Sequence, residues 1–278
     1  MKIVITGANG QLGSDICSVL KKENHEIFEL IHENADISDH YLINKILKDI
    51  QPQVVINPAA YHNVDHCQQN PDIAFSINAI APYNIANTCN ELGALLIHIS
   101  TDYVFDGKKQ EPYVETDCSN PLNHYGVSKL AGEKMILNSG CKCAIIRTSG
   151  LYGLNPCRAK GGKNFIELML SLAEAGKPIR VVDDERVSPT FTKDLAFQIS
   201  KLLNIENSAI YHATAEDSCS WYEFAKSIFE IKNIPANLSI ADPTEFIAKV
   251  NRPKYSVLEN YNIKKLGVHV MRHWKQAL

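Results

Sequence analysis

The sequence predicts an α/β fold in which helices cover both faces of a parallel sheet. In the first half of the chain, short β-branched and aliphatic runs alternate with longer stretches of helical periodicity. The runs are continuously apolar, as expected for strands buried on both faces, and right-handed crossovers between them give a doubly wound sheet. The expected strands span 2–5, 26–31, 53–57, 94–100 and 143–148. Of the helices between them, the first ends near residue 22 and the others span about 39–50, 71–92 and 124–138.

The second half is less regular and predicts a smaller C-terminal lobe. We expect a sheet domain over 1–150 and mainly the lobe over 151–278, with a stretch of about 178–204 returning to the core of the sheet domain. In this half, helical patterns span 161–176, 191–204 and 221–231, strand patterns span 178–182 and 209–214, and the proline-punctuated segment 235–256 is mostly loop.

Composition and charge narrow the class of protein. The 278 residues carry a formal net charge of −3 with scattered basic residues, which gives no reason to expect nucleic acid or an anionic membrane as a partner. The opening run "MKIVITG" is too short for a signal peptide or a membrane span, so we expect a soluble, cytoplasmic protein. Eight cysteines without a CxxC motif are expected to be reduced thiols rather than zinc ligands or disulfides.

A glycine-rich turn follows the first expected strand. In "TGANGQLG", Gly7, Gly10 and Gly13 lie between this strand and the first helix. A dinucleotide pyrophosphate requires a tight turn, a close backbone and a helix N-terminus. The turn therefore predicts an NAD(P)-binding domain of the Rossmann type over 1–150. Glu29 and Glu33 flank the end of the second strand without a clear acidic or basic signature, so the choice between NADPH and NADH stays open.

Tyr125 and Lys129 are one helical turn apart, but their spacing alone is weak evidence. Position distinguishes this pair, because its helix starts after the loop that leaves the strand ending in "ISTD". Parallel sheets bind ligands beyond the carboxyl ends of their strands, so Thr101 and this pair should converge beside the nicotinamide. The same YxxxK spacing recurs outside that crevice at Tyr41/Lys45, Tyr222/Lys226 and Tyr261/Lys265.

This constellation suits the reduction of a ketone. Hydride transfer to carbon must be matched by a proton on oxygen, and the ordinary pKa of tyrosine, about 10, is high for that purpose. We expect the charges of Lys129 and the oxidised nicotinamide to lower the pKa of Tyr125. Thr101, or less favourably Ser100, would donate a hydrogen bond to the carbonyl oxygen as charge develops there.

Longer motifs extend this interpretation. "TGANGQLG", "VVINPAAYHNVD", "HISTDYVFDG", "NPLNHYGVSKLAGEK", "RTSGLYG", "SPTFTKDLA" and "RPKYSVL" run nearly end to end through the chain. With these motifs the chain resembles the extended short-chain dehydrogenase/reductases, and among them the dTDP-4-dehydrorhamnose reductase family. The resemblance implies reduction of dTDP-4-dehydro-L-rhamnose to dTDP-L-rhamnose by NADPH or NADH, in the supply of sugars for cell-surface polysaccharide.

The resemblance also implies roles for individual residues. Tyr125 would donate the proton, assisted by Lys129 and Thr101. The implied cofactor contacts, in addition to Tyr125 and Lys129, are Gly7, Gly10, Gln11, Leu12, Gly13, Asp36, Ile37, Ala59, Ala60, Tyr61 and Ser100. The implied substrate contacts, in addition to Thr101, are Asp102, Tyr103, Gly150, Asn164 and Arg252, with Arg186, Thr190 and Trp221 as further candidates.

Two departures from the family pattern bear on substrate and metal. Gly150 stands where these reductases usually carry a tryptophan that packs against the sugar, which opens room for a different or larger substrate. Asp15 matches one magnesium carboxylate of the family, but the C-terminal "HWKQAL" offers no acid. We therefore expect Asp15 to be an ordinary exposed carboxylate and no magnesium-dependent dimer, although the resemblance still allows a homodimer. His62 and His66, without a third ligand, are expected to be surface histidines rather than a metal pair.

Two alternatives remain at this point. The family includes the regulatory subunit of methionine adenosyltransferase, so a non-catalytic NADP-binding subunit is one, although an intact Thr101, Tyr125 and Lys129 argue against it. The other is a reductase or epimerase for another nucleotide sugar, which Gly150 keeps open.

Overall fold

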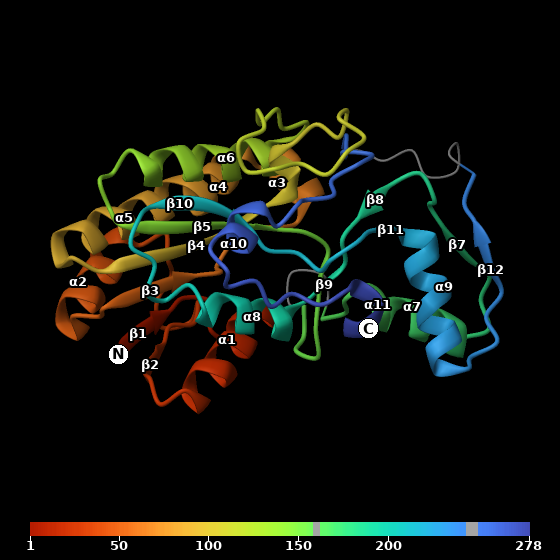
Figure 1. Cartoon of the computed structure of the whole chain (residues 1–278), viewed down its shortest axis with the longest axis horizontal. Helices are drawn as coiled ribbons and strands as arrows, with labels where there is room; N and C mark the ends of the chain where they lie inside the picture. The colour runs from red at the N-terminus through yellow and green to blue at the C-terminus, as the bar shows by residue number, and fades with distance from the viewer. Residues whose placement is uncertain (158–161, 243–249) are drawn as a thin grey trace.

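A computed structural model describes residues 1–157, 162–242 and 250–278, and its centre is a six-stranded parallel sheet (Figure 1). The strand order is β10-β5-β4-β3-β1-β2, and every neighbouring pair is parallel. The order reverses between β1 and β3, which is the topological switch point of a doubly wound sheet. The predicted fold class is therefore confirmed. The strands are β1 Lys2–Ile5, β2 Glu26–Glu29, β3 Val54–Asn57, β4 Leu95–Thr101, β5 Cys143–Thr148 and β10 Ala209–His212.

Helices cover both faces of this sheet (Figure 1). Alternate residues of β1 illustrate the two layers, because Ile3 and Ile5 join the core under one set of helices while Val4 joins the core under the other. The first set is α1 Gln11–Lys22 and α8 Thr192–Ser200, and the second is α2 His40–Ile50, α5 Ala81–Leu92 and α6 His124–Leu137.

The helix predicted over 71–92 is interrupted. It consists of α4 Pro71–Phe75, a π-helical turn η1 Ser76–Ile80, and then α5. Pro82 lacks an N–H group, so the Asn78 carbonyl has no i+4 donor and the helix adopts a wider turn there. A further short helix, α3 Val64–Gln69, was not predicted from the sequence.

The C-terminal lobe is built from two helices, short strand pairs and an aromatic core. Phe165 of α7, Phe224 of α9 and Trp274 near the C-terminus pack together there. The two longer helices are α7 Phe165–Glu174 and α9 Trp221–Lys232, and the short α11 Trp274–Ala277 contributes Trp274. The other short helix near the C-terminus, α10 Tyr261–Lys265, packs against the sheet domain instead. The strand pairs are β6 Leu151–Tyr152 with β9 Thr190–Phe191, β7 Ile179–Val181 with β12 Leu238–Ile240, and β8 Arg186–Val187 with β11 Cys219–Ser220.

The segment that returns to the sheet domain differs from the predicted 178–204. Strand β7 pairs with β12 and belongs to the lobe, whereas α8 packs against α1. Strand β10 also returns, as the edge strand beside β5. The two units are thus interleaved, and the chain crosses between them between β9 and α8.

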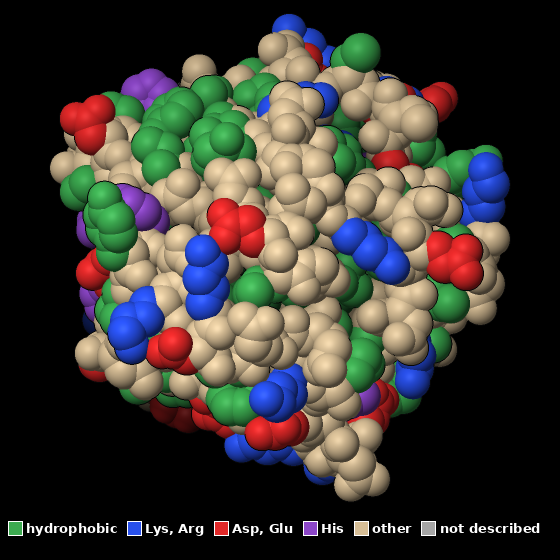
Figure 2. Space-filling view, turned by 90° about the vertical axis from the view of Figure 1, so that its left-hand side faces the viewer, with side chains coloured by type: hydrophobic (Ala, Val, Ile, Leu, Met, Phe, Trp, Pro, Cys, Tyr) green, Lys and Arg blue, Asp and Glu red, His purple; other side chains and the backbone are tan. Residues whose placement is uncertain are grey.

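Charged residues on the described surface are of mixed sign. Figure 2 shows Lys and Arg interspersed with Asp and Glu on one face of the molecule. No helix among residues 1–157, 162–242 and 250–278 has the length and apolar character needed to span a membrane. The eight cysteines are free thiols, and six of them are buried.

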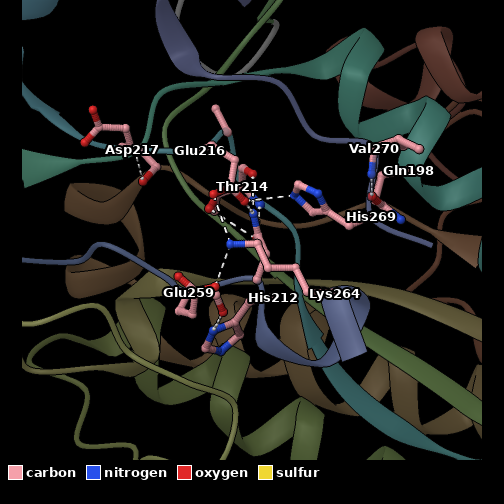
Figure 3. Close-up of polar contacts among 12 residues, drawn as sticks. Gln198, His212, Thr214, Glu216, Asp217, Glu259, Lys264, His269 and Val270 are labelled. Carbon is pink, nitrogen blue, oxygen red and sulfur yellow. Dashed lines mark hydrogen bonds and ion pairs between the residues drawn. The ribbon is translucent and has the colours of Figure 1, made fainter. Parts of the chain in front are cut away.

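A polar cluster fixes the segment around α10 to the end of β10 (Figure 3). Lys264 Nζ lies 3.0 Å from Glu216 Oε2 and 2.6 Å from Glu259 Oε1. The buried Asn260 side chain accepts a hydrogen bond from Thr214 N at 3.0 Å and donates to Thr214 O at 2.9 Å. Asn260 therefore takes the place of a neighbouring strand at the sheet edge.

Replacing Asn260 with alanine should destabilise the protein by about 2–3 kcal/mol, because the buried Thr214 N–H and C=O lose their partner. The measurement is urea unfolding followed by circular dichroism. Asn207→Ala, a change at an exposed asparagine, is the matched control. Equal midpoints for the two variants would contradict this role of Asn260.

Candidate active site

The glycine turn is held tightly between β1 and α1. Gly7 has φ of +53°, and Gly10 N donates to Gly7 O at 2.9 Å. A β-carbon on Gly13 would lie 2.2 Å from Gly7 O, so only glycine allows this approach. The turn leads directly into Gln11 and Leu12, the first residues of α1, where unpaired backbone N–H groups can receive a phosphate.

The loop after β3 forms the neighbouring wall. A β-carbon on Gly7 would lie 3.2 Å from Ala59 Cβ, so Ala59 and its neighbour Ala60 border the turn. The Asn78 side chain, from the π-helical turn, accepts from Tyr61 N and donates to Tyr61 O, each at 2.9 Å. The unpredicted π turn thus holds a predicted cofactor contact in place.

The region after β2 stands at the other side of the turn. Ala8 N donates to Leu30 O at 3.0 Å, and Asn9 Nδ2 lies 3.4 Å from Glu33 Oε2. Asp36 is half-buried beside the buried Ile37, and its Oδ1 accepts from Ser38 N at 2.9 Å. Both predicted residues lie where a nucleotide on this turn would place its adenosine half.

Thr101 and Asp102 lie at the carboxyl end of β4, as predicted. Thr101 Oγ1 donates to Asp102 Oδ1 at 3.0 Å, and Ser149 Oγ donates to Asp102 Oδ2 at 2.9 Å. Burial raises the pKa of Asp102 to about 6, against the hydrogen bonds from Ser256, Ser149 and Thr101. Both carboxylate oxygens accept from protein hydroxyls, so the geometry gives Asp102 the task of orienting Thr101.

Tyr125 meets Thr101 across this end of the sheet. Its ring packs edge-on against Tyr103, with centroids 5.9 Å apart. Burial raises the pKa of Tyr125 above its ordinary value, although a hydrogen bond with Thr101 opposes this shift. The predicted lowering by Lys129 is wrong for the free protein, because the ammonium points to β4 instead. A protonated phenol is nevertheless the form that reduction requires.

Lys129 is almost completely buried, with 1% of its surface exposed. Its Nζ donates to Ile99 O at 2.6 Å and lies 3.1 Å from His98 Nε2. Burial lowers the pKa of Lys129 to about 8, although the charge of Glu133 opposes the shift. An ammonium held in this way keeps one N–H for a further partner.

Of the other three YxxxK pairs, Tyr41/Lys45 and Tyr261/Lys265 lie on the surface, as predicted, whereas Tyr222 is half-buried against the core of the lobe and only its partner Lys226 is exposed. Tyr41 is 79% exposed and Tyr261 is 51% exposed. Lys45 and Lys226 form exposed ion pairs with an acid one turn further along their own helices. Such pairs are ordinary helix surface.

Ser100 faces a buried ion pair and not the crevice. Its hydroxyl donates to Glu133 Oε1 at 2.5 Å. Glu133 Oε2 lies 2.6 Å from Arg147 Nη2, and Arg147 Nε donates to Glu133 Oε1 at 2.9 Å. The structure therefore gives the Ser100 side chain a place in the contact between α6, β4 and β5, which leaves Thr101 as the hydroxyl beside Tyr125.

Comparison with known proteins places this geometry in a family. A family profile described as "RmlD substrate binding domain" matches residues 1–278. The chain belongs to this family. Its members include the dTDP-4-dehydrorhamnose reductase of Mycobacterium tuberculosis, which is 35% identical over 283 residues, covering 100% of this chain and 91% of the relative. The spore coat polysaccharide biosynthesis protein SpsK of Bacillus subtilis is 41% identical over 277 residues, covering 100% and 95%.

Solved structures of related proteins have the same fold as this chain. The crystal structure of dTDP-4-dehydrorhamnose reductase from Bacillus anthracis in complex with NADP has a TM-score of 0.94 and 37% identity, covering 99% of this chain and 96% of that one. A UDP-glucose 4-epimerase from Thermotoga maritima, 18% identical with a TM-score of 0.82 and coverage of 95% and 92%, shares the fold of the extended short-chain dehydrogenase/reductases.

Gly150, where the family resemblance predicts a tryptophan, is constrained by its backbone conformation. It has φ of +55°, and a β-carbon there would lie 3.2 Å from Pro189 Cα. Its carbonyl accepts from Thr190 N at 3.2 Å, which ties β6 to β9. A tryptophan would be strained in this backbone conformation. The backbone conformation and the close approach of Pro189 therefore favour glycine at this position.

The remaining predicted substrate contacts divide into two groups. Asn164 caps α7, accepting from Glu167 N at 3.1 Å, and its Nδ2 donates to Gly153 O at 2.8 Å, so its amide is used within the protein. Arg252 Nη2 lies 3.7 Å from Asp65 Oδ2, and its buried Nε has no hydrogen-bond partner among the described residues. That free donor makes Arg252 the stronger candidate for an anionic substrate group.

The further candidates lie along the lobe side of the crevice. Arg186 in β8 reaches Ser218 O and Glu223, and the Thr190 hydroxyl donates to Ser188 O at 2.9 Å. Trp221 forms a hydrogen bond with Glu185, an acid that sequence reasoning missed. Burial raises the pKa of Glu185, against the charges of Arg252 and Lys254.

Asp15 is not the ordinary exposed carboxylate that was predicted. It is half-buried, and its two oxygens accept from Thr192 Oγ1 at 2.6 Å and from Asn155 Nδ2 at 3.2 Å. It therefore joins α1 to the start of α8. Within the part of the chain that the structure describes, no three His, Cys, Asp or Glu side chains are grouped to hold a metal ion. His62 Nε2 lies 3.8 Å from Cys157 Sγ, while His66 is exposed on α3.

Proposed function

We propose that the protein is a nucleotide-sugar 4-ketoreductase that converts dTDP-4-dehydro-L-rhamnose to dTDP-L-rhamnose with NADPH. The observation that supports this proposal most strongly is the convergence of Tyr125, Thr101 and Lys129 at the carboxyl end of β4. The activity is that of its named relatives, and NADP occupies the Bacillus anthracis relative.

The residues present fit such a cofactor. The glycine turn and the first N–H groups of α1 would hold the pyrophosphate, and Ala59 and Tyr61 would border the nicotinamide half. The third N–H of Lys129 would donate to the ribose. When bound, the reduced nicotinamide supplies a hydride to the C4 carbonyl carbon of the sugar.

The side chains then manage the proton. The Tyr125 hydroxyl transfers its proton to the carbonyl oxygen as the C=O double bond becomes a C–O single bond. The Thr101 hydroxyl donates its one proton to Asp102 in the free protein, and it would redirect that proton to the same oxygen when substrate binds. Solvent then reprotonates the tyrosinate, while Lys129 serves the cofactor ribose.

The direct test supplies purified protein with enzymatically prepared dTDP-4-dehydro-L-rhamnose. The absorbance of the reduced nicotinamide should fall in step with the appearance of dTDP-L-rhamnose. NADPH and NADH are compared in parallel because Glu29 and Glu33 leave the cofactor preference open. No oxidation of either cofactor would overturn the rhamnose assignment.

Gly150 supports a second substrate within the same reaction class. The family resemblance predicts a tryptophan at this position, and a glycine at positive φ has no side chain to pack against a sugar. We therefore include dTDP-4-keto-6-deoxy-D-glucose, the substrate named for a Streptomyces niveus relative, as a competing ketone. A higher kcat/KM for that ketone would move the assignment to it.

Cofactor binding should weaken as pH rises through about 8, because Lys129 loses its charge there in the free protein. Above that value the Kd for NADPH should rise by up to about tenfold per pH unit. Fluorescence titration at a series of pH values measures this Kd. Lys129→Met is the control, because its Kd for NADPH should be higher than that of the parent and should not change with pH above about 8. Identical profiles for the two proteins would exclude Lys129 as the titrating contact.

A further inference from the structure

A buried chain of polar side chains runs across the sheet to Lys129. Thr6, directly after β1, donates through Oγ1 to Asn57 Oδ1 at 2.6 Å. Asn57 Nδ2, at the end of β3, lies 3.2 Å from His98 Nδ1 in β4, and His98 Nε2 lies 3.1 Å from Lys129 Nζ. Each of these four residues is at most 1% exposed.

Two of the three N–H groups of the Lys129 ammonium are fixed, one by the Ile99 carbonyl and one by His98. The Ile99 carbonyl accepts one N–H at 2.6 Å, and His98 Nε2 occupies the second direction. Burial, followed by the charge of Lys129, lowers the pKa of His98 well below its ordinary value, so the imidazole is neutral and can accept.

Two hydrogen-bond arrangements satisfy this chain. With Lys129 charged, Nε2 accepts, so Nδ1 carries the ring proton. This arrangement has the Asn57 amide turned over from its orientation in the structure, so that its oxygen accepts from Nδ1 and its nitrogen donates to Thr6. With Lys129 neutral, each hydrogen bond runs in the opposite direction. The Thr6 hydroxyl donates to the Asn57 oxygen, the Asn57 nitrogen donates to His98 Nδ1, and the protonated Nε2 of His98 donates to the amine. The chain therefore remains paired in both protonation states of the lysine.

We propose that His98 is a positioning residue that holds the Lys129 ammonium against β4 so that one N–H remains directed at the cofactor. This inference rests on the role proposed above for Lys129. The charged and titratable groups near the ammonium are His98 from β4, together with Glu133 and Tyr125 from α6. Glu133 is bonded to Ser100 and Arg147, so it acts on Lys129 through its charge alone.

Two substitutions separate this role from simple burial. His98→Gln places an amide near the Nε2 position and can still accept from Lys129, whereas His98→Asn reaches the Nδ1 position and keeps only the Asn57 contact. His212→Gln is the matched control, because His212 is another completely buried strand histidine, bonded to the Tyr113 and Glu259 carbonyls and remote from Lys129.

The readout is the Kd for NADPH as a function of pH, which does not depend on the identity of the sugar. We expect His98→Asn to weaken binding by about tenfold and to move the alkaline limb to lower pH by about one unit. The Kd of His98→Gln for NADPH should stay within about threefold of that of the parent. The folded molecules of His212→Gln should bind NADPH with the Kd of the parent. If His98→Asn and His98→Gln had the same Kd for NADPH, and that Kd began to rise at the same pH, the inference would be overturned.

A double-mutant cycle closes the test. If His98 acts through Lys129, His98→Asn should have no further effect on NADPH binding in a Lys129→Met background. An undiminished effect there would assign His98 a general structural role instead. If Lys129→Met alone leaves NADPH binding unchanged, the proposed role of Lys129 fails; if it weakens binding while His98→Asn does not, the inference about His98 alone fails.

Discussion

Tyr125→Phe is expected to lower kcat by about a thousandfold, with the Kd for NADPH within about twofold of the parent. The substitution removes the hydroxyl that would protonate the sugar oxygen but keeps the ring. The edge-on contact with Tyr103, at 5.9 Å between centroids, and the Asn123 cap of α6 do not depend on that hydroxyl. The loss should therefore appear in chemistry and not in folding or cofactor binding.

The chain supplies its own controls for this measurement. Tyr41→Phe changes a tyrosine of another YxxxK pair, 79% exposed, and should leave kcat unchanged. Tyr103→Phe tests the neighbouring phenol. Single-turnover reduction with saturating NADPH, combined with fluorescence titration, separates chemistry from binding. Full activity of Tyr125→Phe together with a dead Tyr103→Phe would transfer the role of proton donor to Tyr103.

The central sheet and the pairing of Thr101 with Tyr125 were predictable because both depend on local patterns in a known topological order. Continuous apolar runs are typical of strands that are buried on both faces, and the carboxyl ends of parallel strands share one edge. Gly7, Gly13, Thr101 and Tyr125 all lie where that logic placed them.

Features set by partners distant in the chain were not predictable. Asn164, predicted as a substrate contact, is a different case, because nearby residues use its amide: Glu167 in the capping box of α7, and Gly153. Asp15 was expected in solvent, but it is held by Thr192, which is 177 residues away in the sequence. His98 lies in an apolar run and gave no signal of its own, because its partners are Asn57 at the end of β3 and Lys129 in α6.

Glu133→Ala is expected to lower the free energy of unfolding by about 3–5 kcal/mol, because it leaves the Arg147 guanidinium buried without its counter-charge. The two side chains are 0% and 2% exposed, and Arg147 Cζ also lies 5.1 Å from the centre of the Phe105 ring. Ser100 loses its acceptor at the same time. Guanidinium unfolding measures the change, and Asp49→Ala, which breaks an exposed Lys45–Asp49 pair, should shift the midpoint little.

The double variant Glu133→Leu/Arg147→Met separates stability from alignment. Replacing both charges with apolar side chains removes the desolvation penalty, so the double variant should be more stable than Glu133→Ala. It should still reduce ketone more slowly than the parent, because Glu133, one turn from Lys129 in α6, bonds Arg147 of β5 and Ser100 of β4, the residue next to Thr101. A double variant with full kcat would limit the pair to stability, whereas a stable but slow one would show that the pair aligns Lys129 with Thr101.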